Sequence, residues 1–131
     1  MAEHPNVQKL RDGYAAFSSG DFSKLNDMFT DDVVWHVPGT APISGDYKGK
    51  EEVFGYFGAL MQETGGTFKS ELQEILANDE RGVALQHVSA QRNDKRLDAY
   101  AANIFEMTSD GKVKEVWQMS TDTATGSEFF S

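Results

Sequence analysis

The chain has 131 residues, of which 39% are hydrophobic, and this length suffices for one buried core rather than two. Its formal net charge of −9 argues against a nucleic acid or an anionic membrane as partner, because both are bound through clustered Lys and Arg. The chain has no cysteine, which excludes a disulfide framework, a thiolate nucleophile and a thiolate metal site. We therefore expect a single soluble, acidic domain over residues 1–131.

The sequence carries no sign of membrane insertion or export. No apolar run approaches the roughly 18 residues of a membrane-spanning helix. The first ten residues, MAEHPNVQKL, lack the apolar centre of a signal peptide. We therefore expect a cytoplasmic protein.

The first half of the sequence predicts three helices and one strand. Apolar residues at steps of three and four predict a helix between Pro5 and Gly20. Asp21 is a suitable N-cap for a short second helix. The β-branched and aromatic residues 32–37 predict a strand, and residues 50–64 predict a third helix after a loop of small residues.

The second half predicts a meander of long antiparallel strands. Its segments alternate with period two and are separated by the turn-forming clusters NDERG, NDK and SDG. The predicted strands are residues 67–77, 83–92, 96–108 and 112–121. Helices followed by a sheet indicate an α+β fold in which the helices cover one face of a curved sheet. The tail, residues 123–131, is polar except for Phe129 and Phe130. These two residues are expected to dock at the mouth of a pocket or across a dimer, and the alternative is a disordered tail.

Three segments together resemble the nuclear transport factor 2-like superfamily, in its SnoaL-like and ketosteroid-isomerase-related branch. They are AAFSSGDFSKLNDMFTDDVVW, GDYKGKEEVFGYF and FEMTSDGKVKEVW, and their order and spacing carry the resemblance over residues 5–122. The resemblance implies a cone-shaped fold in which N-terminal helices pack on a strongly curved mixed or antiparallel sheet around one pocket. It also implies a homodimer through the outer sheet face. It does not specify a reaction, because the superfamily includes isomerases, dehydratases, cyclases, epoxide hydrolases and binding domains.

The residues that match the isomerases are an incomplete catalytic set. Tyr14 matches the tyrosine of the family's oxyanion hole, and Asn103 occupies the place of its second donor. The family's carboxylate base lies just before the proline, where this chain has Val37 before Pro38. The resemblance therefore implies half of an oxyanion hole without the isomerase base. Gln118 falls where some relatives carry an acidic residue.

His87 is the predicted general acid–base. Matching the apolar residues of its strand to the core places Val83, Leu85 and His87 on the inner face, and a one-residue slip would reverse that assignment. Histidine titrates near neutral pH and is suited to proton transfer in a pocket. The alternative is a histidine that serves only the structure. Asp122 is the second candidate acid–base group, and His36 is expected to face away from the pocket.

The apolar residues of both halves predict a cavity for a small hydrophobic molecule. The residues predicted to line it are Phe17, Trp35, Val37, Phe57, Met61, Leu85, Phe105 and Gln118. The alternative is that these residues simply fill the core. The alternate residues of the last strands are expected on the outer face: Tyr100, Ile104, Trp117 and Met119. No spacing of metal ligands and no phosphate-binding loop is present, so we expect neither a metal nor a cofactor.

Two functions fit this sequence. The first is a cofactor-independent enzyme of the isomerase, dehydratase or cyclase type, acting on a small hydrophobic carbonyl compound. In this enzyme His87 would transfer a proton, while Tyr14 and Asn103 would stabilise an enolate. The second is a non-catalytic ligand-binding or dimerisation domain of the same fold.

Overall fold

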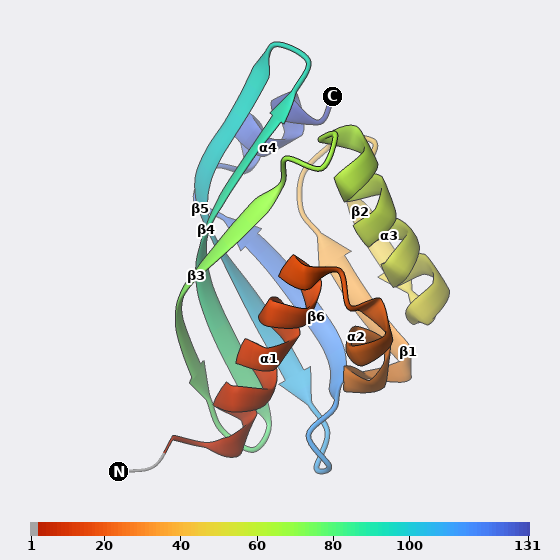
Figure 1. Cartoon of the computed structure of the whole chain (residues 1–131), viewed down its shortest axis with the longest axis vertical. Helices are drawn as coiled ribbons and strands as arrows, with labels where there is room; N and C mark the ends of the chain where they lie inside the picture. The colour runs from red at the N-terminus through yellow and green to blue at the C-terminus, as the bar shows by residue number, and fades with distance from the viewer. Residues whose placement is uncertain (1–2) are drawn as a thin grey trace.

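The computed structural model describes residues 3–131, which form helices and strands in the order shown in Figure 1. The first half contains α1 (Pro5–Ser19), α2 (Phe22–Met28), β1 (Phe29–Val37), β2 (Gly45–Lys48) and α3 (Gly49–Glu63). The second half contains β3 (Lys69–Ala77), β4 (Arg81–Arg92), β5 (Lys95–Met107), β6 (Val113–Ser120) and α4 (Thr123–Phe129). The α+β class predicted from the sequence is confirmed.

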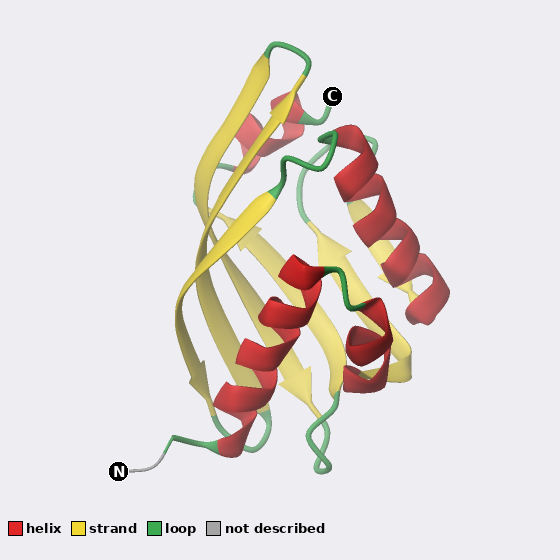
Figure 2. Ribbon diagram, viewed as in Figure 1, coloured by secondary structure: helices red, strands yellow, loops and turns green. Residues whose placement is uncertain are grey.

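The strands form one strongly twisted, mixed sheet in the order β2-β1-β6-β5-β4-β3 (Figure 2). All neighbours pair antiparallel except β1 and β6, which pair parallel. The helices α1, α2 and α3 lie on one side of this sheet, and α4 lies near the tip of the β4–β5 hairpin and the end of α3 (Figure 1). The curved sheet and its covering helices make the predicted cone.

The first two helices begin and end where local chemistry favours it. Pro5 occupies the first turn of α1, where its missing N–H has no partner to lose, and the imidazole of His4 accepts a hydrogen bond from the Asn6 N–H. Gly20 ends α1 in the left-handed conformation, with φ of 75°. The carboxylate of Asp21 caps α2 by accepting from the Lys24 N–H, as predicted.

The core lies between the helices and the concave, inner face of the sheet. The helices α1, α2 and α3 and the longer strands direct their apolar side chains there, which removes these side chains from water and contributes roughly 1.5–3 kcal/mol for each large residue. The most deeply buried members come from several elements and include Leu10, Val33, Val53, Phe57, Phe105 and Val116.

The structure adds two elements that the sequence analysis did not predict. The short strand β2 lies in the predicted loop and pairs with β1, with Val37 opposite Gly45. The helix α4 forms in the polar tail, and the Asp122 carboxylate caps it by accepting from the Thr125 N–H. Because Phe129 is only 1% exposed, the alternative of a disordered tail is wrong. Within residues 3–131, no helix is both long and apolar enough to span a bilayer.

Candidate ligand-binding pocket

A cavity of about 160 Å³ lies between the helices and the inner face of the sheet. Its volume is similar to the roughly 150 Å³ of an engineered apolar cavity that holds one benzene ring. Aromatic and aliphatic side chains make most of the wall, including Phe17, Phe29, Trp35, Phe57, Leu60 and Phe105. Small residues of β5, Ala99 and Ala101, leave the space open on the sheet side. The cavity therefore suits a molecule of about one ring.

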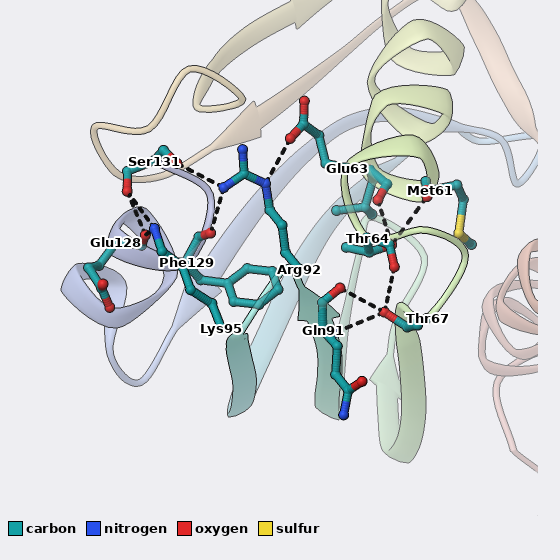
Figure 3. A network of polar contacts seen from close by, with 11 residues as sticks. Met61, Glu63, Thr64, Thr67, Gln91, Arg92, Lys95, Glu128, Phe129 and Ser131 are labelled. Atoms are coloured by element: carbon teal, nitrogen blue, oxygen red, sulfur yellow. Dashed lines mark hydrogen bonds and ion pairs between the residues drawn. The ribbon is translucent and has the colours of Figure 1, made fainter.

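The helix α4 and its neighbours close one end of this cavity. Phe130 lines the cavity, while Phe129 packs against Val88 and Leu97. Arg92, at the end of β4, donates to the carbonyl oxygens of Phe129 and Ser131 at 3.3 and 2.8 Å. The same guanidinium donates through Nε to Glu63 at 2.9 Å, and Lys95 donates to the Glu128 carbonyl (Figure 3). Arg92 thus connects the end of α3 to the end of the chain.

The backbone register brings polar side chains together on the inner face. Asn103 on β5 lies directly opposite Gln118 on β6, and Ala101 lies opposite both Gln86 and Ser120. Side chains opposite each other on antiparallel strands have Cβ atoms about 4.5–5.5 Å apart. The amides of Asn103 and Gln118 therefore reach the same part of the cavity.

Tyr14 and Asn103 form a buried, uncharged pair at the cavity wall. The Asn103 amide donates to the Tyr14 hydroxyl at 2.8 Å. Burial raises the pKa of Tyr14 far above its usual range, and the hydrogen bond from Asn103 only partly opposes this. Tyr14 is therefore a neutral phenol at physiological pH. Asn103 Oδ1 is buried and has no hydrogen-bond partner among residues 3–131.

Gln118 is held in one orientation by two aromatic donors. Its Oε1 accepts from the indole N–H of Trp35 at 3.2 Å and from the hydroxyl of Tyr56 at 3.0 Å. Burial raises the pKa of Tyr56 far above its usual range, so this hydroxyl also keeps its proton. On β4, on the other side of β5, the Gln86 carbonyl accepts from the Ser70 hydroxyl at 2.8 Å. Both glutamines thus use their carbonyl and leave the NH₂ group available.

The wall of this cavity carries no formal charge. Among residues 3–131, the side chains that line it include no Asp, Glu, His, Lys or Arg. Its two ionisable lining residues, Tyr14 and Tyr56, both stay protonated. The wall offers hydrogen bonds from neutral groups and a large apolar surface, and no group that would titrate near pH 7.

The comparisons with known proteins agree with this architecture. The family model of the SnoaL-like domain matches residues 10–116. The chain belongs to the SnoaL-like family. The family prediction is therefore confirmed, over slightly fewer residues than the sequence motifs suggested.

Several solved structures are similar to this chain. Bal32a, from a soil-derived mobile gene cassette, is 38% identical in sequence, and its structure superposes over 96% of both chains with a TM-score of 0.92. The uncharacterized protein Rv0034 of Mycobacterium tuberculosis is 27% identical over 100% of both chains. TerC, crystallised with polyporic acid, is 18% identical and covers 97% of this chain and 98% of its own, with a TM-score of 0.82. This last likeness concerns the fold alone.

Most of the site residues expected from the sequence lie on the cavity wall. The structure places these there: Tyr14, Phe17, Trp35, Val37, Phe57, Phe105, Asn103 and Gln118. Their roles in binding stay predictions. His36 faces away from the cavity, as predicted, and contacts Asp46 and Glu115 at 2.7 and 2.6 Å.

The expectation that His87 and Leu85 line the pocket is wrong. His87 lies on the outer face, where its Nε2 is 2.5 Å from Asp98 and its ring packs against Tyr100. Leu85 is 41% exposed on the same face. The inward residues of β4 are instead the alternate set, Ala84, Gln86, Val88 and Ala90, all of them buried. The strand alternates as predicted but in the opposite phase, so the enzymatic mechanism loses its proposed base.

Two further expected site residues also lie outside the cavity wall. Met61 is half-buried on α3 but does not line the cavity, whereas its neighbour Leu60 does. Asp122 is exposed and serves as the N-cap of α4. The hydrogen bond from the Thr125 hydroxyl lowers the pKa of Asp122, so this carboxyl is ionised and directed into the helix end rather than into the cavity.

Sequence reasoning missed Tyr56 and Gln86, which line the cavity, whereas Phe130 docks at the pocket, one of the places expected for it. Tyr56 lies beside the predicted Phe57 on α3, so a wider helical stripe would have included it. Gln86 follows from the correct phase of β4, and Phe130 depends on the unexpected helix α4. Among residues 3–131, no group of three or more metal-ligating side chains is found.

Proposed function

We propose that this protein binds a small, uncharged and largely apolar molecule that carries hydrogen-bonding oxygen atoms. We also propose that the side chains of the pocket do not catalyse proton transfer to or from this molecule. The uncharged wall of the cavity carries this proposal, because every described lining side chain is apolar or a neutral hydrogen-bonding group. Apolar walls supply affinity by removing ligand surface from water, and the few polar groups orient the ligand. This is the second of the two functions that fit the sequence.

The missing base is the reason for preferring binding over proton transfer. A general base must lie within hydrogen-bond reach of the proton it removes and must titrate near the working pH. His87, the expected base, lies on the opposite side of the sheet and cannot reach a ligand in the cavity. Asp122 is engaged by the end of α4. Tyr14 keeps its proton and can donate a hydrogen bond, which orients a carbonyl oxygen without removing a proton elsewhere.

The family and the fold support a pocket of this kind. The chain belongs to the SnoaL-like family, and TerC, with the same fold, was co-crystallised with polyporic acid. An uncharged pocket favours a neutral ligand here, because moving an unpaired charge into an apolar site is costly.

Native mass spectrometry of the purified protein, followed by extraction and identification of any bound compound, tests this proposal. Ala101→Phe fills the cavity and is expected to abolish binding, whereas Ala102→Phe, the adjacent residue on the outer face, is the matched control and should leave binding intact. Circular dichroism of both variants establishes that they are folded. Equal binding by both variants would place the ligand elsewhere.

The same compound is then incubated with the wild type, and its products are followed by liquid chromatography and mass spectrometry. We expect it to be recovered unchanged. Turnover that Ala101→Phe abolishes and Ala102→Phe retains would overturn the non-catalytic part of the proposal. It would mean that the pocket performs chemistry with neutral donors alone.

We also propose that a second copy of the chain covers the outer face of the sheet. Leu85, Tyr100 and Met119 are 41%, 57% and 49% exposed there and border a shallow hollow. An exposed apolar area of this kind supports a protein interface, and a two-fold axis lets one such surface pair with itself. Sedimentation velocity should report a dimer for the wild type and a monomer for Tyr100→Glu. A monomeric wild type at micromolar concentration would refute it.

A further inference from the structure

Three amide side chains on the inner face each use one end and leave the other free. The carbonyl of Gln86 accepts from Ser70, and the carbonyl of Gln118 accepts from Trp35 and Tyr56. Asn103 is reversed, because its NH₂ group donates to Tyr14 and its Oδ1 has no partner among the described residues. The ends left for a ligand are therefore two NH₂ donors and one carbonyl acceptor.

The unpaired Oδ1 of Asn103 indicates what the ligand must supply. Asn103 is only 4% exposed, and a buried acceptor without a partner destabilises the structure because it has lost its water. A ligand that brings an O–H to this oxygen removes this destabilisation. The hydroxyl of Tyr14 already accepts from Asn103, so its own proton is available to the same ligand.

The acceptor that the Tyr14–Asn103 pair offers is Asn103 Oδ1 in this structure, and the exchanged placement of the amide would move it to the Tyr14 oxygen. Exchanging the oxygen and nitrogen of the amide would make Tyr14 the donor and leave the NH₂ group free beside the phenol oxygen. In both arrangements, the Tyr14–Asn103 pair presents one donor and one acceptor to the cavity.

The orientation of Gln118, in contrast, is fixed by chemistry. The indole N–H of Trp35 can only donate, so the Gln118 atom beside it must be the carbonyl oxygen. The NH₂ group of Gln118 is therefore the free end, and it requires an acceptor. Because Gln118 lies directly opposite Asn103, the donor that Asn103 needs and the acceptor that Gln118 needs lie on the same part of the ligand.

We infer that the ligand of this pocket carries a hydroxyl and a carbonyl group on neighbouring carbon atoms attached to an apolar ring. This inference rests on the proposed function and names its ligand class. The hydroxyl donates to Asn103 Oδ1 and the carbonyl accepts from the Gln118 NH₂ group, while the ring packs among Trp35, Phe57 and Phe105. An apolar ketone without the hydroxyl enters the same cavity but leaves the Asn103 oxygen unpaired.

Four one-ring compounds test this inference by calorimetry or NMR titration: α-hydroxyacetophenone, α-methoxyacetophenone, acetophenone and 2-phenylethanol. The first has both groups, the second and third lack the donor, and the fourth lacks the carbonyl. We expect α-hydroxyacetophenone to bind the wild type about tenfold tighter than each of the others, since 1.4 kcal/mol corresponds to tenfold in affinity.

Asn103→Leu is expected to abolish this preference and to leave the affinity for acetophenone equal or higher. The readout is a ratio of two affinities measured on one protein, so a change in stability cancels. Tyr14→Phe, which keeps the ring, should reduce the preference without removing it. Outer-face Ile104→Leu is the control and should keep the wild-type ratio.

The outcomes separate the two claims. Equal affinity of the wild type for α-hydroxyacetophenone and α-methoxyacetophenone would overturn the inference and leave the proposed function standing, with a water molecule pairing the amide. A preference that persists in Asn103→Leu would also overturn it. If none of the four compounds binds at millimolar concentration, the proposed function fails and the inference fails with it.

Discussion

The two faces of the sheet are built from alternate residues of the same strands, yet they carry different chemistry. On β4 the inward residues Ala84, Gln86 and Val88 are uncharged and buried. The outward His87, between them, contacts Asp98 at 2.5 Å and lies 3.9 Å from Glu71. The outward His36 on β1 likewise contacts Asp46 and Glu115. The histidines of the sheet and their carboxylate partners therefore lie on the outside.

This difference follows from the cost of burying charge. An ionised side chain on the concave face would lose its water without a partner, whereas each amide there is uncharged and has a hydrogen bond to a serine or aromatic side chain. A neutral, apolar interior also strengthens each remaining hydrogen bond, because the local dielectric is low. The inner face is thus suited to orienting a ligand and the outer face to stabilising the sheet.

The largest expected effect comes from placing a charge on the inner face. Ala84→Asp puts a carboxylate at a fully buried position and should destabilise the fold by about 3–5 kcal/mol, as uncompensated buried charges do. Gln91→Asp, on the outward phase of the same strand, should change stability by less than about 0.5 kcal/mol. Urea unfolding measures both. Similar destabilisation by the two variants would contradict the division between the faces.

The same strand shows why the fold could be predicted from the sequence while the site could be predicted only in part. Helical and strand periods, together with caps such as Asp21, depend on neighbouring residues and are visible in the chain. The phase of β4 depends on its pairing with β5, where Ala101 lies opposite Gln86. Val83 and Leu85 are more apolar than Ala84 and Gln86, so apolar matching selected the wrong face. A cavity needs small and polar residues inside, which such matching penalises.

The remaining differences arise where tertiary contacts override local signals. The strand β2 has only four residues, none of them buried, and exists because β1 offers it an edge. The helix α4 has a polar sequence and is too short to be stable alone, since isolated helices need about 12–15 residues. Its folding depends on the contacts of Phe129 and on Arg92. The inward phase of β5, in contrast, followed from the family resemblance at Asn103, because period two places Phe105 on the same face.

The second prediction concerns how α4 completes the inner face. Phe129→Ala removes a ring that is 1% exposed and packed on Val88, Ala90 and Leu97, so it should cost about 3 kcal/mol in unfolding free energy. Phe130→Ala, at a half-buried neighbour that lines the cavity, should cost clearly less while weakening ligand binding. Thermal unfolding with and without ligand separates the two effects. A stable Phe129→Ala variant would mean that α4 is not part of the core.

The third prediction concerns Arg92, the charged residue at the end of the inward-facing row of β4. Arg92→Leu removes the donor that joins Glu63 to the carbonyls of Phe129 and Ser131 (Figure 3). Hydrogen bonds to a charged group contribute about 1.5–3 kcal/mol, so amide exchange in residues 125–130 should accelerate about tenfold or more. Exposed Arg96→Leu, on the outer phase of β5, is the control. Unchanged exchange in Arg92→Leu would show that apolar packing alone holds α4.

The smallest expected effect belongs to the outer face and depends on pH. The hydrogen bond to Glu115, and after it the contact with Asp46, raises the pKa of His36 above its usual value, although partial burial opposes this. The protonated ring therefore stabilises the fold below pH of about 6.5, the usual histidine pKa, and this contribution is lost as the pH rises through the higher pKa of the folded state. At this half-buried site we expect a contribution of at most about 1 kcal/mol. Urea unfolding of the wild type and His36→Gln between pH 5.5 and 8.5 measures it. The difference in stability between the two proteins should shrink as the pH increases. A difference that stays constant would mean that the His36 ring is neutral and donates a hydrogen bond through its N–H without carrying a charge.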